Sequence, residues 1–309
     1  MTNNKSTYFF NTSDNNAIAV YYYQANVALP KGAILIVHGM MEHAQRYAEF
    51  AQYLTQSGYH VYCYDQRGHG ATGASYGLGH LLPKTTWNHF VSDCNEMITD
   101  IQTRHPGLPI TLFGHSMGSF VSLNTLIQAT DKLSNVILSG SAYQSPIETR
   151  IGLTLSRFLL TLLPPKTKGY LFHLIIFGGF NLRFFPSRTP ADWISRDKNK
   201  VDDCINDPQT GFCCSNYFFN VLFSGLNHLF QQHVISTIPN RPLLFISGSD
   251  DPIAGRSAKK IYQLSKIIAK AGHTQHTVKI YPQARHELIN ELNRQDVFAD
   301  IVSWLDKRQ

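Results

Sequence analysis

The chain has 309 residues, of which 43% are hydrophobic and 16% are charged. This length fits one large domain or a domain with an insertion, and the composition excludes an intrinsically disordered chain. The formal net charge is +6, but the Lys and Arg residues form no basic stripe along the sequence, so we expect no nucleic-acid partner.

The N-terminal segment lacks the features of a secretory signal. MTNNKSTYFF runs directly into the polar NTSDNN, with no basic start and no small-residue cleavage site. The most apolar stretch, residues 171–180, has only ten residues, whereas a membrane-spanning helix needs about 20. The five cysteines are an odd number without framework or zinc-site spacing, so we expect reduced thiols and no metal. We therefore expect a cytoplasmic protein that could contact a membrane peripherally.

Short β-rich runs alternate with helical patterns along most of the chain. The apolar runs are continuous rather than alternating, which is typical of strands buried on both faces of a mostly parallel sheet. Alternating strands and helices predict a three-layer α/β fold. We expect strands at residues 17–23, 33–38, 60–65, 110–114, 135–139, 242–247 and 277–281, and helices at residues 44–57, 89–104, 117–129, 257–271 and 295–307.

The alternation stops between residues 145 and 238. This stretch is dense in aromatic and aliphatic residues and is interrupted by Pro164 and Pro165, which predicts several short helices. We expect an inserted helical cap over the carboxyl edge of the sheet, where ligands bind in open α/β folds. The alternative is a set of additional core helices. The expected domains are an α/β core of residues 1–144 and 239–309 and a cap of residues 145–238.

A G-x-S-x-G element lies between an apolar strand and an amphipathic helix. It consists of Gly114, His115, Ser116, Met117 and Gly118. This context is that of a nucleophile on a strained strand-to-helix turn, as in the α/β-hydrolase fold, and the two glycines leave room for the turn. The N-terminus of the following helix favours the negative charge that forms during acyl transfer. Ser116 is therefore the expected nucleophile; the alternative is a serine that only caps the helix.

A serine nucleophile needs a base and an orienting carboxylate, which follow it in the order Asp, His in this fold. Asp250 and Asp251 both lie just past the strand expected at residues 242–247, and one of them should be the acid. His286 follows the strand at residues 277–281 and is the best of 14 histidines for the base. We expect His273 and His276, before that strand, to be surface loop residues.

A second glycine-containing turn follows the strand at residues 33–38. It begins with His38 and Gly39 and continues with Met40. In this fold that loop supplies one oxyanion amide, and the residue after the nucleophile supplies the other. The backbone N–H groups of Met40 and Met117 are therefore the expected donors.

Six ordered elements resemble the monoacylglycerol lipase and lysophospholipase branch of the α/β-hydrolases, a serine aminopeptidase-like family. They are HGMMEHAQRY, DQRGHG, GHSMGS, DWISRDKNKVDDCINDPQTGF, SGSDDPI and ARHE. The resemblance implies a mostly parallel eight-stranded sheet with helices on both faces and an inserted helical cap. It selects Asp251 as the acid and places the base at His286. The chain differs from the family after His38 and Gly39, where the family commonly has small residues and this chain has Met40 and Met41. These bulkier side chains should narrow the acyl pocket.

The resemblance also implies an activity: hydrolysis of the acyl ester of a single-chain lipid, a monoacylglycerol or lysophospholipid, through an acyl-enzyme intermediate and without a cofactor. A carboxylesterase, thioesterase or aminopeptidase acting on small substrates is the alternative within enzymes, because fold and triad do not determine the leaving group. A binding module without chemistry is the alternative outside them.

The polar residues of the DQRGHG element and of the turn after the strand at residues 33–38 have two interpretations: they line the site, or they brace loops at the sheet edge. We favour bracing, because a complete triad is available elsewhere. The residues are Asp65, Arg67, His69, Glu42 and His43.

The expected cap also contains basic residues among its aromatic ones. Lys166, Lys168, Arg183 and Arg188 could let it contact membranes transiently. The alternative is that its apolar side chains only line an acyl pocket.

Overall fold

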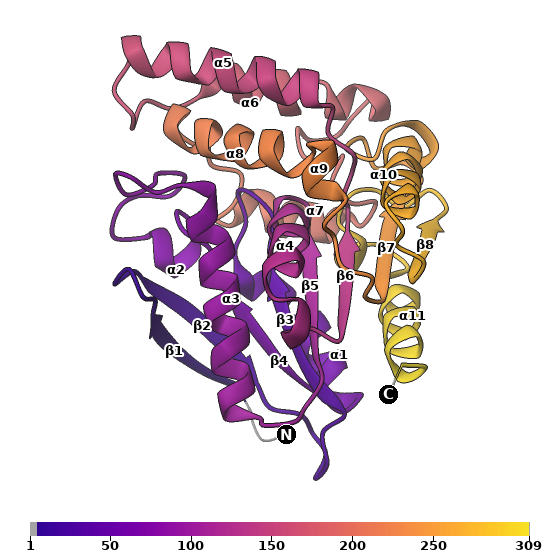
Figure 1. Cartoon of the computed structure of the whole chain (residues 1–309). Coiled ribbons are helices and arrows are strands. Elements are labelled where there is room, and N and C mark those ends of the chain that lie inside the picture. The colour runs from indigo at the N-terminus through magenta and orange to yellow at the C-terminus, as the bar shows by residue number, and fades with distance from the viewer. Residues whose placement is uncertain (1–4, 309) are drawn as a thin grey trace.

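The computed structural model describes residues 5–308 and contains one eight-stranded sheet (Figure 1). The strand order is β1-β2-β4-β3-β5-β6-β7-β8; β2 runs antiparallel to both its neighbours, and the strands from β4 to β8 are parallel. The strands are β1 (Lys5–Asn11), β2 (Ala17–Tyr23), β3 (Gly32–Val37), β4 (Tyr59–Tyr64), β5 (Ile110–His115), β6 (Asn135–Ser139), β7 (Leu243–Gly248) and β8 (His276–Tyr281).

The seven strands expected from the sequence are confirmed, each within one residue of its expected bounds. The strand ranges read from the sequence did not include β1, although the family resemblance implied an eight-stranded sheet. This strand lies at the edge of the sheet, pairs with β2, and exposes several of its residues. An edge strand with polar exposed positions has no continuous apolar run to mark it.

Helices cover both faces of the sheet. Successive residues of β3 contact different cores: Leu35 and Val37 belong to the cluster that includes α3 and α4, and Ile34 and Ile36 to the one that includes α1 and α11. The expected helices are confirmed, but two of them are divided: residues 44–57 into η1 and α1, and residues 257–271 into η4 and α10. The elements are η1 (Ala44–Tyr47), α1 (Ala48–Gln56), α2 (Gly70–Gly73), α3 (Trp87–Arg104), α4 (Met117–Gln128), η2 (Thr130–Lys132), η4 (Arg256–Ala258), α10 (Lys259–Lys270), η5 (Leu288–Asn290) and α11 (Arg294–Asp306).

Residues 145–238, called the cap segment below, form helices as expected, but α5, with 17 residues, and α8, with 14, are longer than the short helices predicted. Figure 1 shows α5, α6 and α8 stacked beyond the end of the sheet to which the parallel strands point, and α5 packs along α8. The division into a core and a cap domain at these residues stays a prediction. The elements are α5 (Pro146–Leu162), α6 (Tyr170–Phe177), η3 (Phe180–Phe184), α7 (Lys198–Asn206), α8 (Asn216–Leu229) and α9 (Gln232–Ile235).

The prediction that His273 is a surface residue is wrong. Its side chain is buried, with 2% of its surface exposed, and burial lowers the pKa of its imidazole. His276 is partly exposed and begins β8, with its ring centroid 5.9 Å from that of His273. The polar sequence around the two histidines contained no sign that one of them packs inward.

All five cysteines are free thiols, and all except Cys204 are buried. Within residues 5–308, the longest and most apolar helices fall short of what a bilayer span requires. The cytoplasmic location stays a prediction.

Candidate active site

The carboxyl ends of parallel strands meet at one edge of a sheet, and the expected site residues follow four of those ends. Ser116 follows β5, the turn with Met40 follows β3, Asp251 follows β7, and His286 follows β8. The topology therefore brings together residues that are far apart in the sequence.

Ser116 lies on a tight turn between β5 and α4. Its backbone has φ 51° and ψ −119°, a conformation that is strained for a residue with a side chain. The turn is held by a hydrogen bond from the Ser116 N–H to the Ser139 carbonyl, at 2.9 Å. A Cβ on Gly118 would lie 2.1 Å from the Val37 carbonyl oxygen, so α4 can start this close to β3 only with glycine there. Gly114, the penultimate residue of β5, is buried.

His286 and Asp251 form a buried hydrogen-bonded pair. The His286 Nδ1 lies 2.9 Å from Asp251 Oδ2, and the two residues expose 3% and 0% of their surfaces. The other Asp251 oxygen accepts the Ile253 N–H at 2.8 Å. Burial opposes protonation of His286, but the nearby carboxylates, first that of Asp251, outweigh it and raise the pKa of the imidazole above 6.5. The ring is thus oriented by Asp251 and made more basic.

Asp250 has a different environment. Its carboxylate pairs with Arg183 of η3 at 2.8 Å, and both side chains are about one-third exposed. Of the two neighbouring acids, the one that contacts the His286 ring is therefore Asp251.

The Ser116 hydroxyl and the His286 ring line the same cavity without a hydrogen bond between them. His115, which precedes Ser116, lies near His286, with ring centroids 4.6 Å apart and ring planes tilted by 46°. Burial, then the neighbouring His286, lowers the pKa of His115 to about 4. A neutral His115 therefore lies between the turn and the paired imidazole.

Gly140, just after β6, makes room for this pair of rings. It has φ 58°, and a Cβ there would lie 2.8 Å from His286 Cε1 and 3.1 Å from His115 Cε1. We expect Gly140→Ala to displace the His286 ring and lower kcat on the order of a hundredfold, since misplacing a catalytic group by about 1 Å has that effect. Ester hydrolysis assays would measure it.

The matched control is Gly107→Ala. Gly107 also has a positive φ, 82°, but a Cβ there would meet nothing within 4 Å. It should reproduce the backbone strain and the loss of thermal stability while leaving kcat unchanged. Equal kcat losses in both variants would show that strain, rather than the position of His286, limits activity.

In the turn after β3, the backbone N–H groups of Gly39 and Met41 are hydrogen-bonded, and within residues 5–308 that of Met40 between them is not. The Gly39 N–H donates to the Glu42 carboxylate, and the Met41 N–H donates to His69 Nε2 at 3.1 Å. The Met40 N–H between them has no hydrogen-bond acceptor in the described part of the chain. Met40 and Met117 both line the cavity beside Ser116, which is where the oxyanion donors are expected.

His38 and His69 support this turn as neutral rings. His38 Nε2 accepts the Gln66 N–H at 3.0 Å, and the His69 ring accepts that of Met41, so the accepting nitrogens carry no proton. Burial, as the largest cause, lowers the pKa of each ring to about 3.

These pKa values predict a loss of stability in acid. The unfolded chain binds protons on both rings below about pH 6.5, whereas the folded chain does not, so the free energy of unfolding falls as pH decreases. Each ring should contribute a loss of about 2 kcal/mol between pH 7 and pH 5. Urea unfolding at the two pH values would show a smaller acid effect in His69→Gln than in the wild type. His233→Gln, which alters an exposed cap histidine, should leave the effect unchanged.

The DQRGHG turn mainly braces loops, as favoured from the sequence. Arg67 pairs with Asp93 at 2.6 Å and with Asp14 at 2.8 Å, and Asp65 accepts the backbone N–H groups of Ala44 and Ala71. These charge-assisted bonds hold the end of β4 against α2, α3 and the turn before η1.

His43 contributes a link between the core and the cap segment. Its Nε2 lies 2.8 Å from the carboxylate of Asp207, just after α7.

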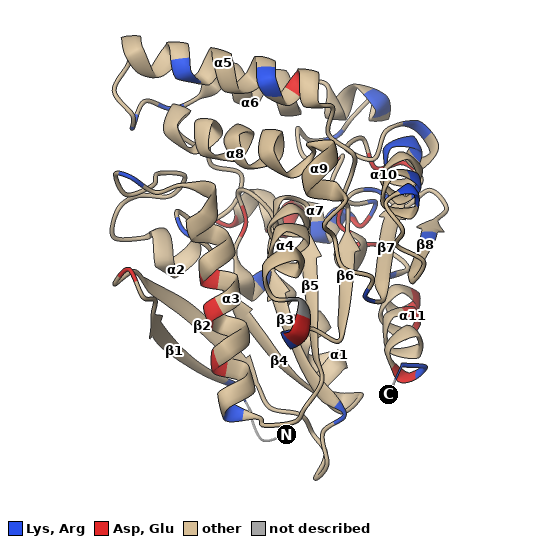
Figure 2. Ribbon diagram, in the orientation of Figure 1, with Lys and Arg blue, Asp and Glu red and all other residues tan. Residues whose placement is uncertain are grey.

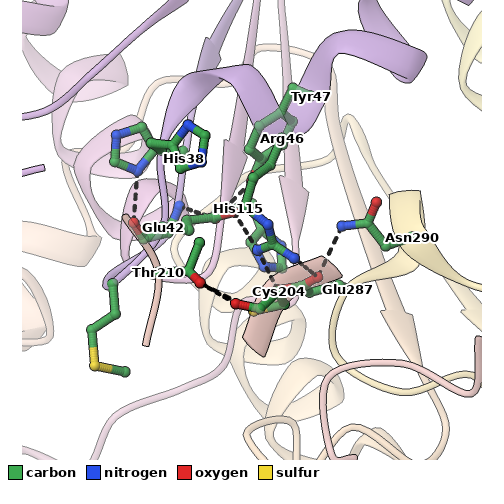
Figure 3. Close-up of polar contacts among 12 residues, drawn as sticks. His38, Glu42, Arg46, Tyr47, His115, Cys204, Thr210, Glu287 and Asn290 are labelled. Carbon is green, nitrogen blue, oxygen red and sulfur yellow. Dashed lines mark hydrogen bonds and ion pairs between the residues drawn. The ribbon is translucent and has the colours of Figure 1, made fainter. Parts of the chain in front are cut away.

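A buried ion-pair network that sequence reasoning missed lies at the turn after β3. Figure 3 shows Arg46 with the carboxylates of Glu42 and Glu287; it pairs with Glu42 at 3.0 Å and binds Glu287 through two contacts of 2.7 Å. Burial raises the pKa of Glu287, but Arg46 outweighs it and lowers that pKa. Glu42 lies only four positions from Arg46, but no sequence spacing reveals the second partner, Glu287, which is 241 positions away.

Ser116, His286 and the Arg46–Glu287 pair line one cavity of about 1390 Å³. Its wall is mostly apolar and comes largely from the cap segment, including residues of α5, α6, η3 and α8. Trp193 of the cap segment lies against His286, with the two ring centroids 5.2 Å apart. Glu42, Arg46 and Thr210 form a polar part of the wall. The cavity suits a molecule with a long apolar portion and a small polar portion.

Comparison with known proteins agrees with this architecture. A family model described as serine aminopeptidase, S33 (Hydrolase_4) matches residues 28–293. The chain is 27% identical to human monoglyceride lipase over 93% of this chain and 86% of that protein. It is 26% identical to a monoacylglycerol lipase of Mycolicibacterium smegmatis over 89% and 88% of the two chains.

Among solved structures, a thermostable carboxyl esterase from Bacillus coagulans, in complex with glycerol, superposes with a TM-score of 0.90. The two share 25% identity over 98% of each chain. With the sheet order, the turn at Ser116 and the family match, these similarities show that the chain belongs to the serine aminopeptidase S33 family of α/β-hydrolases and is a hydrolase of the lipase and esterase type.

Proposed function

We propose that this chain hydrolyses the acyl ester of a single-chain lipid through an acyl-enzyme intermediate. The observation that supports it is the position of Ser116 on the wall of a large, mostly apolar cavity that also contains the paired His286. An acyl chain would lie against the cap segment while its ester carbonyl meets the serine. The polar wall at Glu42 and Arg46 would face the hydrophilic part of the substrate.

In the proposed reaction, the Ser116 hydroxyl attacks the ester carbonyl as His286 accepts its proton. The Met40 and Met117 amides donate to the oxyanion, and Asp251 stabilises the imidazolium. The proton then passes from His286 to the departing alcohol, leaving an acyl ester on Ser116. Water, activated by the same imidazole, releases the fatty acid and regenerates the serine. The hydrogen bond between Ser116 and His286 forms in the substrate complex, as is common for catalytic pairs.

The proposed head group is glycerol or a glycerophosphate derivative. Two relatives are named for monoacylglycerol or monoglyceride hydrolysis, and the esterase from Bacillus coagulans was solved with glycerol. The test is hydrolysis of a monoacylglycerol and a lysophospholipid with matched acyl chains, with Ser116→Ala as the control. Ser116-dependent release of fatty acid supports the proposal and identifies the head group. Activity confined to short soluble esters, thioesters or peptides would contradict it.

We also propose that the cap segment touches lipid surfaces. Large apolar side chains are exposed on α5, on α6, and in and just after η3, including Leu182 of η3 at 74% and Phe185, the residue after η3, at 82%. Exposed apolar clusters of this kind typically mark an interaction site. The other exposed members are Ile147, Ile151, Phe158, Leu162, Tyr170, Leu171, Leu174 and Ile175.

The basic cap residues expected to assist this contact are partly engaged elsewhere. Arg183 pairs with Asp250 and Arg188 with Asp202, and Lys166 lies over the ring of Tyr76 at 3.6 Å. If the cap segment binds lipid, Leu182→Ser with Phe185→Ser should reduce sedimentation with phosphatidylcholine vesicles. Unchanged sedimentation would exclude these side chains from the contact.

A further inference from the structure

The positive charge of this chain is concentrated in one segment. Residues 252–286 contain seven Lys and Arg residues and no Asp or Glu, whereas the whole chain has a net charge of +6. The sequence as a whole predicts no basic stripe of Lys and Arg residues. That expectation does not hold for the segment between Asp251 and His286.

Five of these cations lie on η4 and α10, where Figure 2 shows Lys and Arg gathered. Within residues 5–308 no carboxylate forms an ion pair with any of them, in contrast to most arginines of the chain. The opposite face of α10 is buried in the core through Ile261, Leu264 and Ile268. The helix is thus anchored by its apolar face, and its outer face is cationic. The cations are Arg256, Lys259, Lys266 and Lys270, which are exposed, and Lys260, which is partly exposed.

This cationic face adjoins the wall of the cavity and lies near the exposed apolar part of the cap segment. Lys260, in the first turn of α10, lines the cavity together with Ile151 of α5. The loop between β7 and η4 is tied to η3 through the pair of Asp250 with Arg183, and η3 contains the exposed Leu182. A flat surface that meets the apolar side chains of η3 would therefore also lie near the start of α10.

We infer that the exposed face of η4 and α10 is a docking surface for an anionic lipid bilayer. Lipid head groups supply negative charge beside an apolar interior, which matches cations next to exposed apolar side chains. A nucleic acid or an acidic protein would complement the cations but not the neighbouring apolar residues. Docking in this orientation brings the part of the cavity wall at Lys260 close to the membrane that contains the substrate. The functional advantage of this docking rests on the proposed lipid hydrolase function. The binding test below does not depend on catalysis.

The test compares sedimentation with vesicles of phosphatidylcholine alone and of phosphatidylcholine mixed with phosphatidylglycerol. We expect the wild type to prefer the anionic vesicles and to lose that preference at high salt. The variant Lys259→Gln/Lys266→Gln/Lys270→Gln should bind anionic vesicles about a hundredfold more weakly, since each Lys near such a surface contributes roughly a fivefold factor. The control Lys84→Gln/Lys132→Gln/Lys307→Gln removes the same charge from exposed positions outside this face and should bind as the wild type does.

Hydrolysis of a short soluble ester is measured for the two triple Lys→Gln variants and should be unchanged, which shows that these proteins are folded. Equal binding losses in the two triple variants would overturn the inference, because net charge alone would then explain the effect. Binding to duplex DNA without binding to anionic vesicles would also overturn it. Preserved vesicle binding in Ser116→Ala, with no lipid hydrolysis by the wild type, would instead reject the proposed function and leave the docking surface intact.

Discussion

Ser116→Ala is expected to lower kcat for ester hydrolysis by about a millionfold, the loss seen when the nucleophile of a serine triad is removed. Ser116 is the residue with the strained φ of 51° on the turn that opens into the cavity. Without its hydroxyl no acyl-enzyme forms, and residual activity comes only from the oxyanion amides and substrate positioning. The measurement is steady-state hydrolysis of a soluble ester, together with labelling of the protein by a fluorophosphonate probe, which should be abolished.

The control for this experiment is Ser187→Ala. Ser187 places another hydroxyl on the wall of the same cavity, from the cap segment. Its removal should change kcat less than about tenfold, because it lies on no strand-to-helix turn and near no base. Thermal unfolding of both variants would show that neither substitution disrupts the fold. Ordinary activity in Ser116→Ala would refute the proposed mechanism.

Asp251→Asn is expected to lower kcat by about ten-thousandfold. An amide at this position preserves the shape but cannot stabilise the imidazolium or hold the same tautomer of His286, whose Nδ1 lies 2.9 Å from Asp251 Oδ2. Because the Asp251 carboxylate is the main cause that raises the pKa of His286, its removal should also shift the pH dependence of kcat/KM. The profile of the variant should keep its base deprotonated to lower pH than that of the wild type.

Asp250→Asn provides a matched comparison one residue away. It removes a pair with Arg183 in which both side chains are about one-third exposed, so the pair contributes little to stability, and it leaves the His286 partner in place. We expect kcat within about threefold of the wild type. A larger loss in Asp250→Asn than in Asp251→Asn would mean that the acid has been assigned to the wrong neighbour.

The sequence by itself determined the α/β architecture and the position of the turn at Ser116. Strands such as β3 and β5 are short, continuous apolar runs, and their local composition is enough to mark them. The turn is likewise local, because glycine, serine and glycine at fixed spacing after a strand produce it. Edge strand β1 lacked such a run, and the burial of His273 depends on packing that no neighbouring residue encodes.

Only the tertiary structure decided which side chains meet. From the residues alone, Asp250 and Asp251 follow the same strand equally well, and they differ in that one faces His286 and the other faces Arg183. Arg46 and Glu287 form their buried pair across 241 positions. Contacts of this kind arise where the carboxyl ends of parallel strands converge, because sheet order rather than sequence distance sets which loops are neighbours.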